Sequence, residues 1–118
     1  ETRSLVIAQT LLEKNSFNST QISDLIDDVL PHHRCKGDNK PVSINARVMA
    51  TADAVAHLTT NFYLWAVHKR GQEGAAFDEA CSWARKKIER DYFDKIQFDG
   101  IRQDVKPNYD ALKLLFSL

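Results

Sequence analysis

The stretch that decides the fold runs from Ser43 to Arg70 and reads SINARVMATADAVAHLTTNFYLWAVHKR. Its larger apolar residues recur at helical spacing, at Ile44, Val48, Ala52, Val55, Phe62 and Trp65. Ser43 offers a side-chain oxygen that can cap the first turn, and alanines fill much of the remaining circumference. We therefore predict one long helix over residues 44–70. A helix that is apolar on most sides belongs in the middle of a bundle.

Two shorter helices are predicted before this stretch. Apolar residues spaced by three and four indicate a helix over 4–14. A stronger pattern of the same kind is formed by Ile22, Leu25, Ile26, Val29 and Leu30. This second helix is expected to be capped by Ser19 or Thr20 and to end or kink at Pro31, which has no amide hydrogen. Residues 34–42 are rich in turn formers and are expected to form a loop.

A fourth helix is predicted from about residue 76 to Tyr92. Its apolar side includes Phe77, which we expect to point inward, whereas Lys87 and the neighbouring charged residues should face water. A fifth helix is predicted over 108–116.

Breaks at Asp99-Gly100 and Lys106-Pro107 separate these last two helices. No segment alternates apolar and polar residues in the manner of a strand. The predicted fold class is all-α, a bundle of about five helices.

Composition excludes several classes of function. The chain has 118 residues, and its 16 Lys plus Arg balance 16 Asp plus Glu. A neutral chain lacks the basic surplus of a protein that binds nucleic acid or an anionic membrane. No apolar run approaches the roughly 20 residues of a membrane span, so we expect a cytoplasmic protein. Cys35 and Cys81 lack the spacing of metal ligands and are expected to be free thiols.

Asp53 is the first candidate for a functional residue, because it is a carboxylate among alanines in the long predicted helix. Burying a lone carboxylate costs several kcal/mol unless a partner compensates it. One candidate partner is His57, four residues further on the same helix face. The other is a metal ion shared with His32 or His33, since imidazole and carboxylate are ligands of first-row divalent ions. Both alternatives stay open on the residues alone.

The order of these residues resembles the second half of an HD-domain metal-dependent phosphohydrolase. Pro31-His32-His33 is followed by a polar loop and then by the segment from Ser43 to Ala54. The resemblance extends to about Tyr92. In that superfamily a helical bundle carries a first His, a His-Asp dyad, often further His residues, and a late Asp beside small residues. The resemblance implies that His32, His33 and Asp53 are metal ligands.

The first His and the His-Asp dyad are missing, because no His precedes His32. The resemblance therefore implies that residues 1–118 are a single helical domain, the carboxy-terminal part of a longer HD domain. Such a chain is expected to be inactive alone and to bind divalent metal weakly.

The activity implied by the resemblance is hydrolysis of a nucleotide or another small phosphate ester. Divalent ions, whether Mn, Mg, Fe, Co or Zn, would polarise the phosphoryl group and activate a water. Four basic residues flank the expected ligands and are candidates to neutralise the phosphate, against the alternative of ordinary solvated charges: Arg34, Lys36, Lys40 and Arg47. His57 is expected to contact the metal ligands and not the metal itself. No nucleic acid or membrane partner is expected.

A second hypothesis is a non-enzymatic helical module that mediates interaction. Aromatic residues of the long helix and the fourth helix would form its surface, and a homodimer is the simplest assembly.

Overall fold

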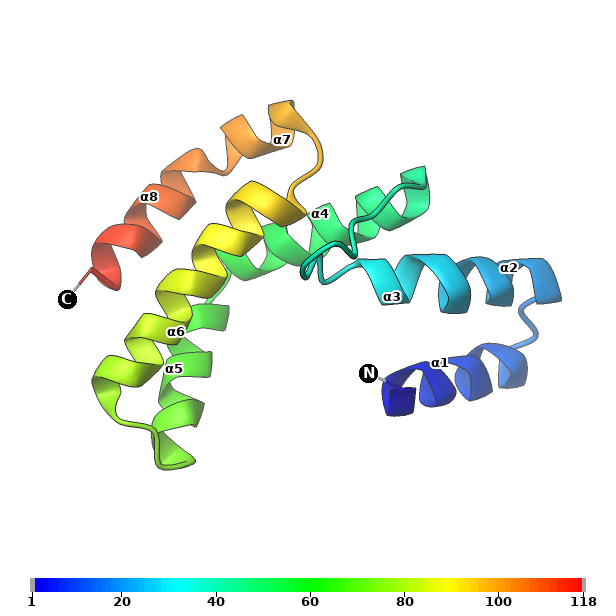
Figure 1. Cartoon of the computed structure of the whole chain (residues 1–118), viewed down its shortest axis with the longest axis horizontal. Coiled ribbons are helices and arrows are strands. Elements are labelled where there is room, and N and C mark those ends of the chain that lie inside the picture. The colour runs from blue at the N-terminus through cyan, green and yellow to red at the C-terminus, as the bar shows by residue number, and fades with distance from the viewer. Residues whose placement is uncertain (1, 118) are drawn as a thin grey trace. The chain divides into compact units, whose positions relative to one another are not determined.

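The computed structural model describes residues 2–117, and within that range the chain forms helices and no strand (Figure 1). The predicted all-α class is confirmed. The helical segments outnumber the five predicted, mainly because the long predicted helix is broken and a short helix was missed. The chain divides into two compact units, residues 1–50 and 51–118.

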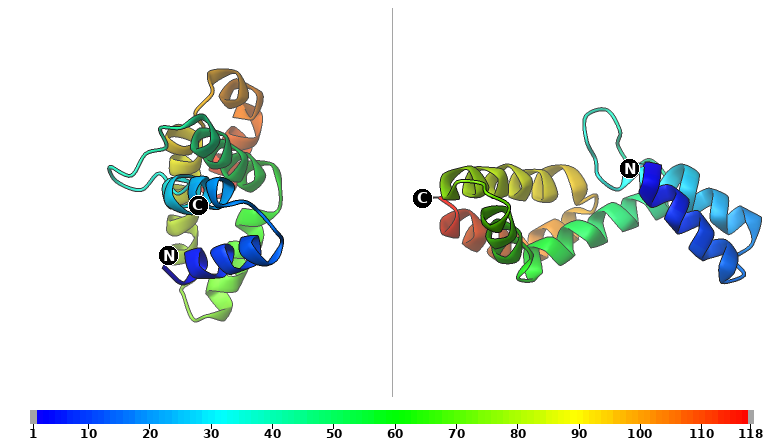
Figure 2. Two further views of the ribbon diagram at one scale, coloured as in Figure 1. Left: turned by 90° about the vertical axis from the view of Figure 1, so that its right-hand side faces the viewer. Right: turned by 90° about the horizontal axis from the view of Figure 1, so that it is seen from below.

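The first unit is an antiparallel arrangement of α1 against the helical run that follows it (Figure 2). The elements are α1 (Thr2–Lys14), α2 (Ser19–Ser23), the π-helical turn η1 (Asp24–Val29) and α3 (Leu30–His32). The cap of this run differs from the prediction. Asn18, and neither Ser19 nor Thr20, accepts from the backbone N–H of Gln21 at 2.9 Å, while the Gln21 side chain accepts from the Asn18 N–H. This reciprocal pair is a capping box.

The sequence predicted that this helix ends or kinks at Pro31; in the structure it continues one residue further, to His32. It widens into π geometry just before the proline, where the N–H of Leu30 donates to the carbonyl of Leu25. Proline clashes with the preceding turn of an ordinary α-helix, and the wider turn gives its ring room. The run therefore passes through Pro31 and brings both histidines to its end.

The long helix predicted over 44–70 is two helices, α4 (Ile44–Thr59) and α5 (Phe62–Gln72). The break falls at Thr60 and Asn61, directly after Thr59. Both threonine hydroxyls donate to carbonyls four residues earlier, at 2.7 Å, and the Thr60 hydroxyl also accepts from the N–H of Phe62. Such side-chain bonds compete with the helical ladder and favour helix ends. The start of α4 is as predicted, since the Ser43 hydroxyl accepts from the N–H of Ala46 at 3.1 Å.

The second unit packs α5 and α8 against α6 (Figure 1). Its remaining elements are α6 (Phe77–Arg90), the π-helical turn η2 (Asp91–Lys95), α7 (Asp99–Asp104) and α8 (Lys106–Leu115). Residues from all of its longer helices share one apolar core: Ala54, Leu58, Tyr63, Cys81, Ala84, Ile88, Tyr92, Ile96, Val105, Tyr109 and Phe116. Tyr92 and Tyr109 stack with ring centroids 4.0 Å apart. Cys81 lies in this core and Cys35 is buried in the first unit; both are free thiols, as predicted.

The expectations for residues 99–100 and for Phe77 were wrong. The predicted break at Asp99-Gly100 is the start of α7, which Arg102 holds by donating to the carbonyls of Tyr92 and Ile96. These tertiary hydrogen bonds sustain a helix that local sequence does not predict. Phe77 was expected inside, yet it is 66% exposed at the first turn of α6.

Candidate functional site

His32 and His33, the two predicted metal ligands of the first unit, are held by their own helix. Nδ1 of His32 lies 2.6 Å from the carbonyl of Asp28, and Nδ1 of His33 contacts the carbonyl of Leu30. A carbonyl only accepts, so each contact requires a proton on Nδ1, and the neutral form of either ring carries its lone pair on Nε2. Both half-buried rings are therefore held in a fixed orientation.

The start of α4 is tied to the same helical run. The Ser43 hydroxyl donates to the carboxylate of Asp28, and the Asn45 amide donates to Asp24 at 2.9 Å. Asp28 also lies 3.3 Å from Nδ1 of His32. The first unit thus fixes His32 through backbone and side-chain contacts and His33 through a backbone contact.

The basic residues predicted to meet phosphate lie after the histidines. Arg34, Lys36 and Lys40 are exposed on the loop between α3 and α4, and Arg47 is half-buried on α4. Asn39 anchors this loop by donating to the carbonyl of Pro31 at 2.7 Å. The role of the four basic residues in binding phosphate stays a prediction.

Asp53, the predicted ligand of the second unit, has a partner that sequence reasoning missed. Its carboxylate forms an ion pair with Lys95, which is only 3% exposed and lies on η2. The carboxylate itself is 32% exposed. The sequence analysis weighed His57 or a metal as the compensating group, because a lysine 42 residues away on another element gives no local signal.

Lys95 also reaches Asp91, which is the centre of a buried polar network. Asp91 is fully buried and accepts from Nδ1 of His57 at 2.9 Å and from Nζ of Lys87 at 3.1 Å. The hydroxyl of Tyr63 donates to it at 2.5 Å. Lys87 was predicted to face water, but its side chain is 12% exposed because it turns toward this carboxylate.

The network perturbs the acidity of its members. Burial by itself would raise the pKa of Asp91, but the hydrogen bond from His57 and the charge of Lys87 outweigh it and hold that pKa below its usual range. Burial lowers the pKa of Lys87, and the charge of Asp91 offsets this only in part. Burial, together with Asp91, raises the pKa of the Tyr63 hydroxyl far above its usual range. Asp91 is therefore ionised at neutral pH and Tyr63 is protonated.

His57 connects this buried network to Asp53. Its ring stacks on Phe62 with centroids 3.8 Å apart, and Nδ1 is engaged by Asp91. Nε2 faces the Asp53 carboxylate, with 3.7 Å between Nε2 and Oδ1. The expectation that His57 contacts a metal ligand and not the metal itself stays a prediction.

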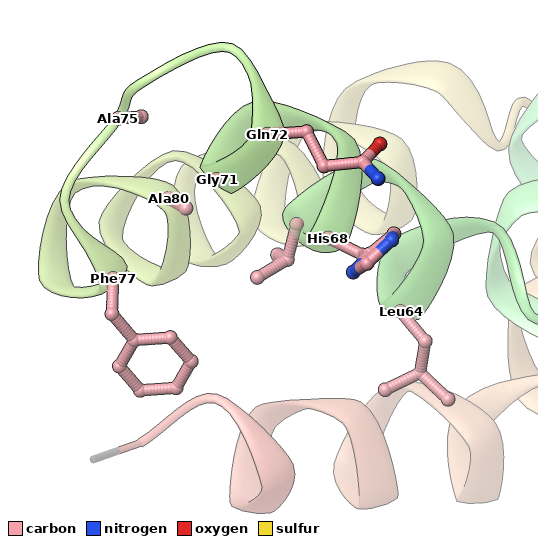
Figure 3. Close-up of a pocket in the computed structure, with 8 residues that line it drawn as sticks. Leu64, His68, Gly71, Gln72, Ala75, Phe77 and Ala80 are labelled. Atoms are coloured by element: carbon pink, nitrogen blue, oxygen red, sulfur yellow. The ribbon is translucent and has the colours of Figure 1, made fainter.

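An apolar groove lies elsewhere in the second unit, between α5 and α6 (Figure 3). It has a volume of about 580 Å³ and is lined mainly by apolar side chains that include Leu64, Val67 and Phe77. None of the predicted ligands lines it.

Searches for related proteins return no match: no protein-family model, curated protein or solved structure matches the chain. Among the residues that the structure describes, no helix is long and apolar enough to span a membrane. In the same residues, no group of three or more His, Cys, Asp and Glu side chains has the arrangement of a metal site. His32 and His33 belong to the first unit and Asp53 to the second, and their common role as ligands stays a prediction.

Proposed function

We propose that the protein is a metal-dependent phosphohydrolase of the HD type that acts on a nucleotide or another small phosphate ester. The observation that carries the proposal is the state of the two histidines at the end of α3. Each is anchored through Nδ1 to a backbone carbonyl, which leaves Nε2 as the basic nitrogen. Histidines that bind metals are neutral and are usually fixed in this way through their other ring nitrogen.

Asp53 adds the third proposed ligand. Its carboxylate is partly open to solvent, and the ion pair with Lys95 holds it in place. A divalent ion bound by such residues supplies a polarised phosphoryl oxygen and a water of lowered pKa. Arg34, Lys36, Lys40 and Arg47 are the proposed cationic groups for the substrate phosphate.

The proposal is tested by assaying the gene product that contains this chain with any sequence encoded upstream of it. We expect Mn²⁺-dependent release of phosphate from p-nitrophenyl phosphate or a nucleoside monophosphate. Asp53→Asn and His33→Gln should each abolish it, whereas His68→Gln, on α5, should leave it unchanged. Full activity in Asp53→Asn would refute the assignment.

The isolated chain of 118 residues provides a second test. It lacks the upstream His and His-Asp dyad that the resemblance requires, so we expect no measurable turnover with any divalent metal. Robust metal-dependent hydrolysis by this chain alone would mean that the active site has been placed on the wrong residues.

The exposed apolar side chains of the second unit favour one other candidate function, a helical module that forms a homodimer. Leu64 and Trp65 on α5 are 52% and 58% exposed, and Phe77 on α6 is exposed as well. Large apolar side chains gathered beside a groove are typical of interaction surfaces. Light scattering after size exclusion tests this: Phe77→Lys should dissociate the dimer, and Val42→Lys in the first unit should not. A wild-type protein that stays monomeric at high concentration would refute this function.

A further inference from the structure

The groove between α5 and α6 is bordered by apolar side chains that the second unit leaves exposed. Figure 3 shows Phe77 and Leu64 on opposite sides of the open space. Phe77 is 66% exposed and Leu64 is 52% exposed. Aromatic side chains are enriched in protein interfaces relative to the rest of the surface. The groove therefore has a candidate anchor at its own edge.

Gly71 leaves part of the groove without a side chain. It lies in the last turn of α5, and a Cβ added to it would meet no described atom within 4 Å. Its φ lies outside the left-handed region, so neither the backbone conformation nor packing within the chain requires glycine. Glycine is a poor helix former, and one of its structural uses is to let another group approach the backbone closely.

The open space at Gly71 can hold an aromatic ring. The groove has a volume of about 580 Å³, and a cavity of about 150 Å³ is large enough for benzene. Phe77 and Gly71 line the same groove, so one surface carries both a protruding ring and a space for one. In a two-fold dimer each copy presents the same patch to the other. The ring of each copy can then enter the groove of the other.

The exposed apolar surface beside the groove has the size that such a pairing requires. Leu64, Trp65 and Phe77 are 52%, 58% and 66% exposed, which corresponds to roughly 400 Å² of side-chain surface. An interface of standard size buries about 800 Å² on each copy, and somewhat more than half of that area is apolar. These three side chains therefore supply most of the apolar area of such an interface.

The charges around the groove favour a second copy of this chain over a partner of one charge sign. Lys69 on α5 is exposed and lies 3.9 Å from Glu73. Asp78 and Glu79 are exposed in the first turn of α6. A surface that carries both signs can pair with itself, because Lys69 of one copy can meet a carboxylate of the other. The net charge of the chain is zero, so two copies do not repel each other.

We propose that two copies of this chain pair about a two-fold axis at the groove, with Phe77 of each copy seated in the groove of the other beside Gly71. Leu64 and Val67, which line the groove, then pack on the inserted ring. The proposal rests on the homodimer named above as the second candidate function, and it states how that dimer is held together. It involves none of the proposed metal ligands.

The test is the variant Gly71→Leu, which fills the space at Gly71 and adds apolar surface. Seating of Phe77 predicts that its dissociation constant rises at least about 30-fold, the loss of one strong interface anchor. Association through a general apolar patch would instead become stronger. Gly100→Leu is the matched control, since Gly100 also has open space at its Cβ but lies on α7 and does not line the groove. It should dimerise as the wild type does in sedimentation velocity.

A mixing experiment tests whether the seating is reciprocal. Phe77→Ala removes the inserted ring and should weaken the dimer by a similar factor. Mixed with Gly71→Leu, it should dimerise again, because Phe77 of the Gly71→Leu copy enters the open groove of the other copy. The shortened side chain at position 77 then faces the groove that the leucine fills. A mixture that stays monomeric would overturn the proposal.

The outcomes separate this proposal from the function on which it rests. A wild-type chain of 118 residues that stays monomeric overturns both. A wild-type dimer whose dissociation constant is equal or lower in Gly71→Leu overturns the seating of Phe77 and leaves the homodimer standing. Circular dichroism checks that each variant is folded.

The wild-type dimer gives a measurement that does not depend on any variant. In a mixture of isotope-labelled and unlabelled copies, the ring protons of Phe77 in one copy should show a nuclear Overhauser effect to the α-protons of Gly71 in the other. A wild-type dimer without this intermolecular contact would overturn the proposal.

Discussion

Replacing Asp91 with Asn should severely destabilise the second unit. Asp91 is fully buried and serves as counter-ion to Lys87 and Lys95, whose side chains are 12% and 3% exposed. The amide of Asn has almost the same shape but no charge. Removing one partner of a buried ion pair costs about 3–5 kcal/mol, because the remaining charge stays buried without compensation.

That cost is a large part of the about 5–15 kcal/mol that stabilises a typical domain. With a denaturant slope of about 2 kcal/mol/M, a loss of about 4 kcal/mol lowers the urea midpoint by about 2 M. Tryptophan fluorescence is the assay, since both tryptophans, Trp65 and Trp83, lie in the unit that contains Asp91.

Asp110→Asn is the matched control. Asp110 is paired with Lys106, four residues earlier, just as Asp91 is paired with Lys87, but both side chains of the control pair are exposed, at 54% and 59%. Exposed pairs contribute little, so its midpoint should not move measurably. A midpoint for Asp91→Asn within about 0.5 M of wild type would refute the view that Asp91 is the charge centre of this unit.

Three further predictions address the pH dependence, the core and the helix cap. The pKa of Asp91 is lower in the folded chain than its ordinary 3.8. Its contribution to stability is therefore complete above pH 3.8 and is lost as pH falls through the folded pKa. Fluorescence-monitored unfolding from pH 6 to pH 2 should show this loss in the wild type and less of it in Asp91→Asn, and an equal dependence of stability on pH in the two proteins would contradict the prediction. Ile88→Ala removes a fully buried side chain from the core and should cost about 2–5 kcal/mol, measured by urea unfolding, whereas a cost below about 1 kcal/mol would mean that the site collapses or is not packed. Ser43→Ala removes the acceptor of the Ala46 N–H and should cost about 0.5–2 kcal/mol of stability. Unfolding is followed by circular dichroism, because the first unit has no tryptophan. An unchanged unfolding transition would show that the cap is dispensable.

The helical class was predictable because helix formation depends on neighbours three and four residues away. The pattern at Ile22 to Leu30 lies within the helical segments of the structure, the pattern at Tyr109 to Phe116 lies on α8 and its C-cap residue, and the cap at Ser43 is in place. The break at Thr60 and Asn61, directly after Thr59, had a local signal, two threonines and an asparagine, that an apolar pattern on either side obscured. Arg102 holds α7 through carbonyls ten and six residues earlier, outside its own helix, and helical periodicity does not report such contacts.

The sequence by itself determined the all-α class and the position of most helical segments, and it indicated that Cys35 and Cys81 are free thiols and that Asp53 needs a compensating partner. The tertiary structure decided which partner that is, and it brought Lys87 from a predicted solvent position into the network around Asp91. The physical reason is that burial and charge compensation depend on groups that meet only when helices pack. Asp91 lies 34 residues from His57 and 28 residues from Tyr63, so only the packed unit could reveal that they form one network.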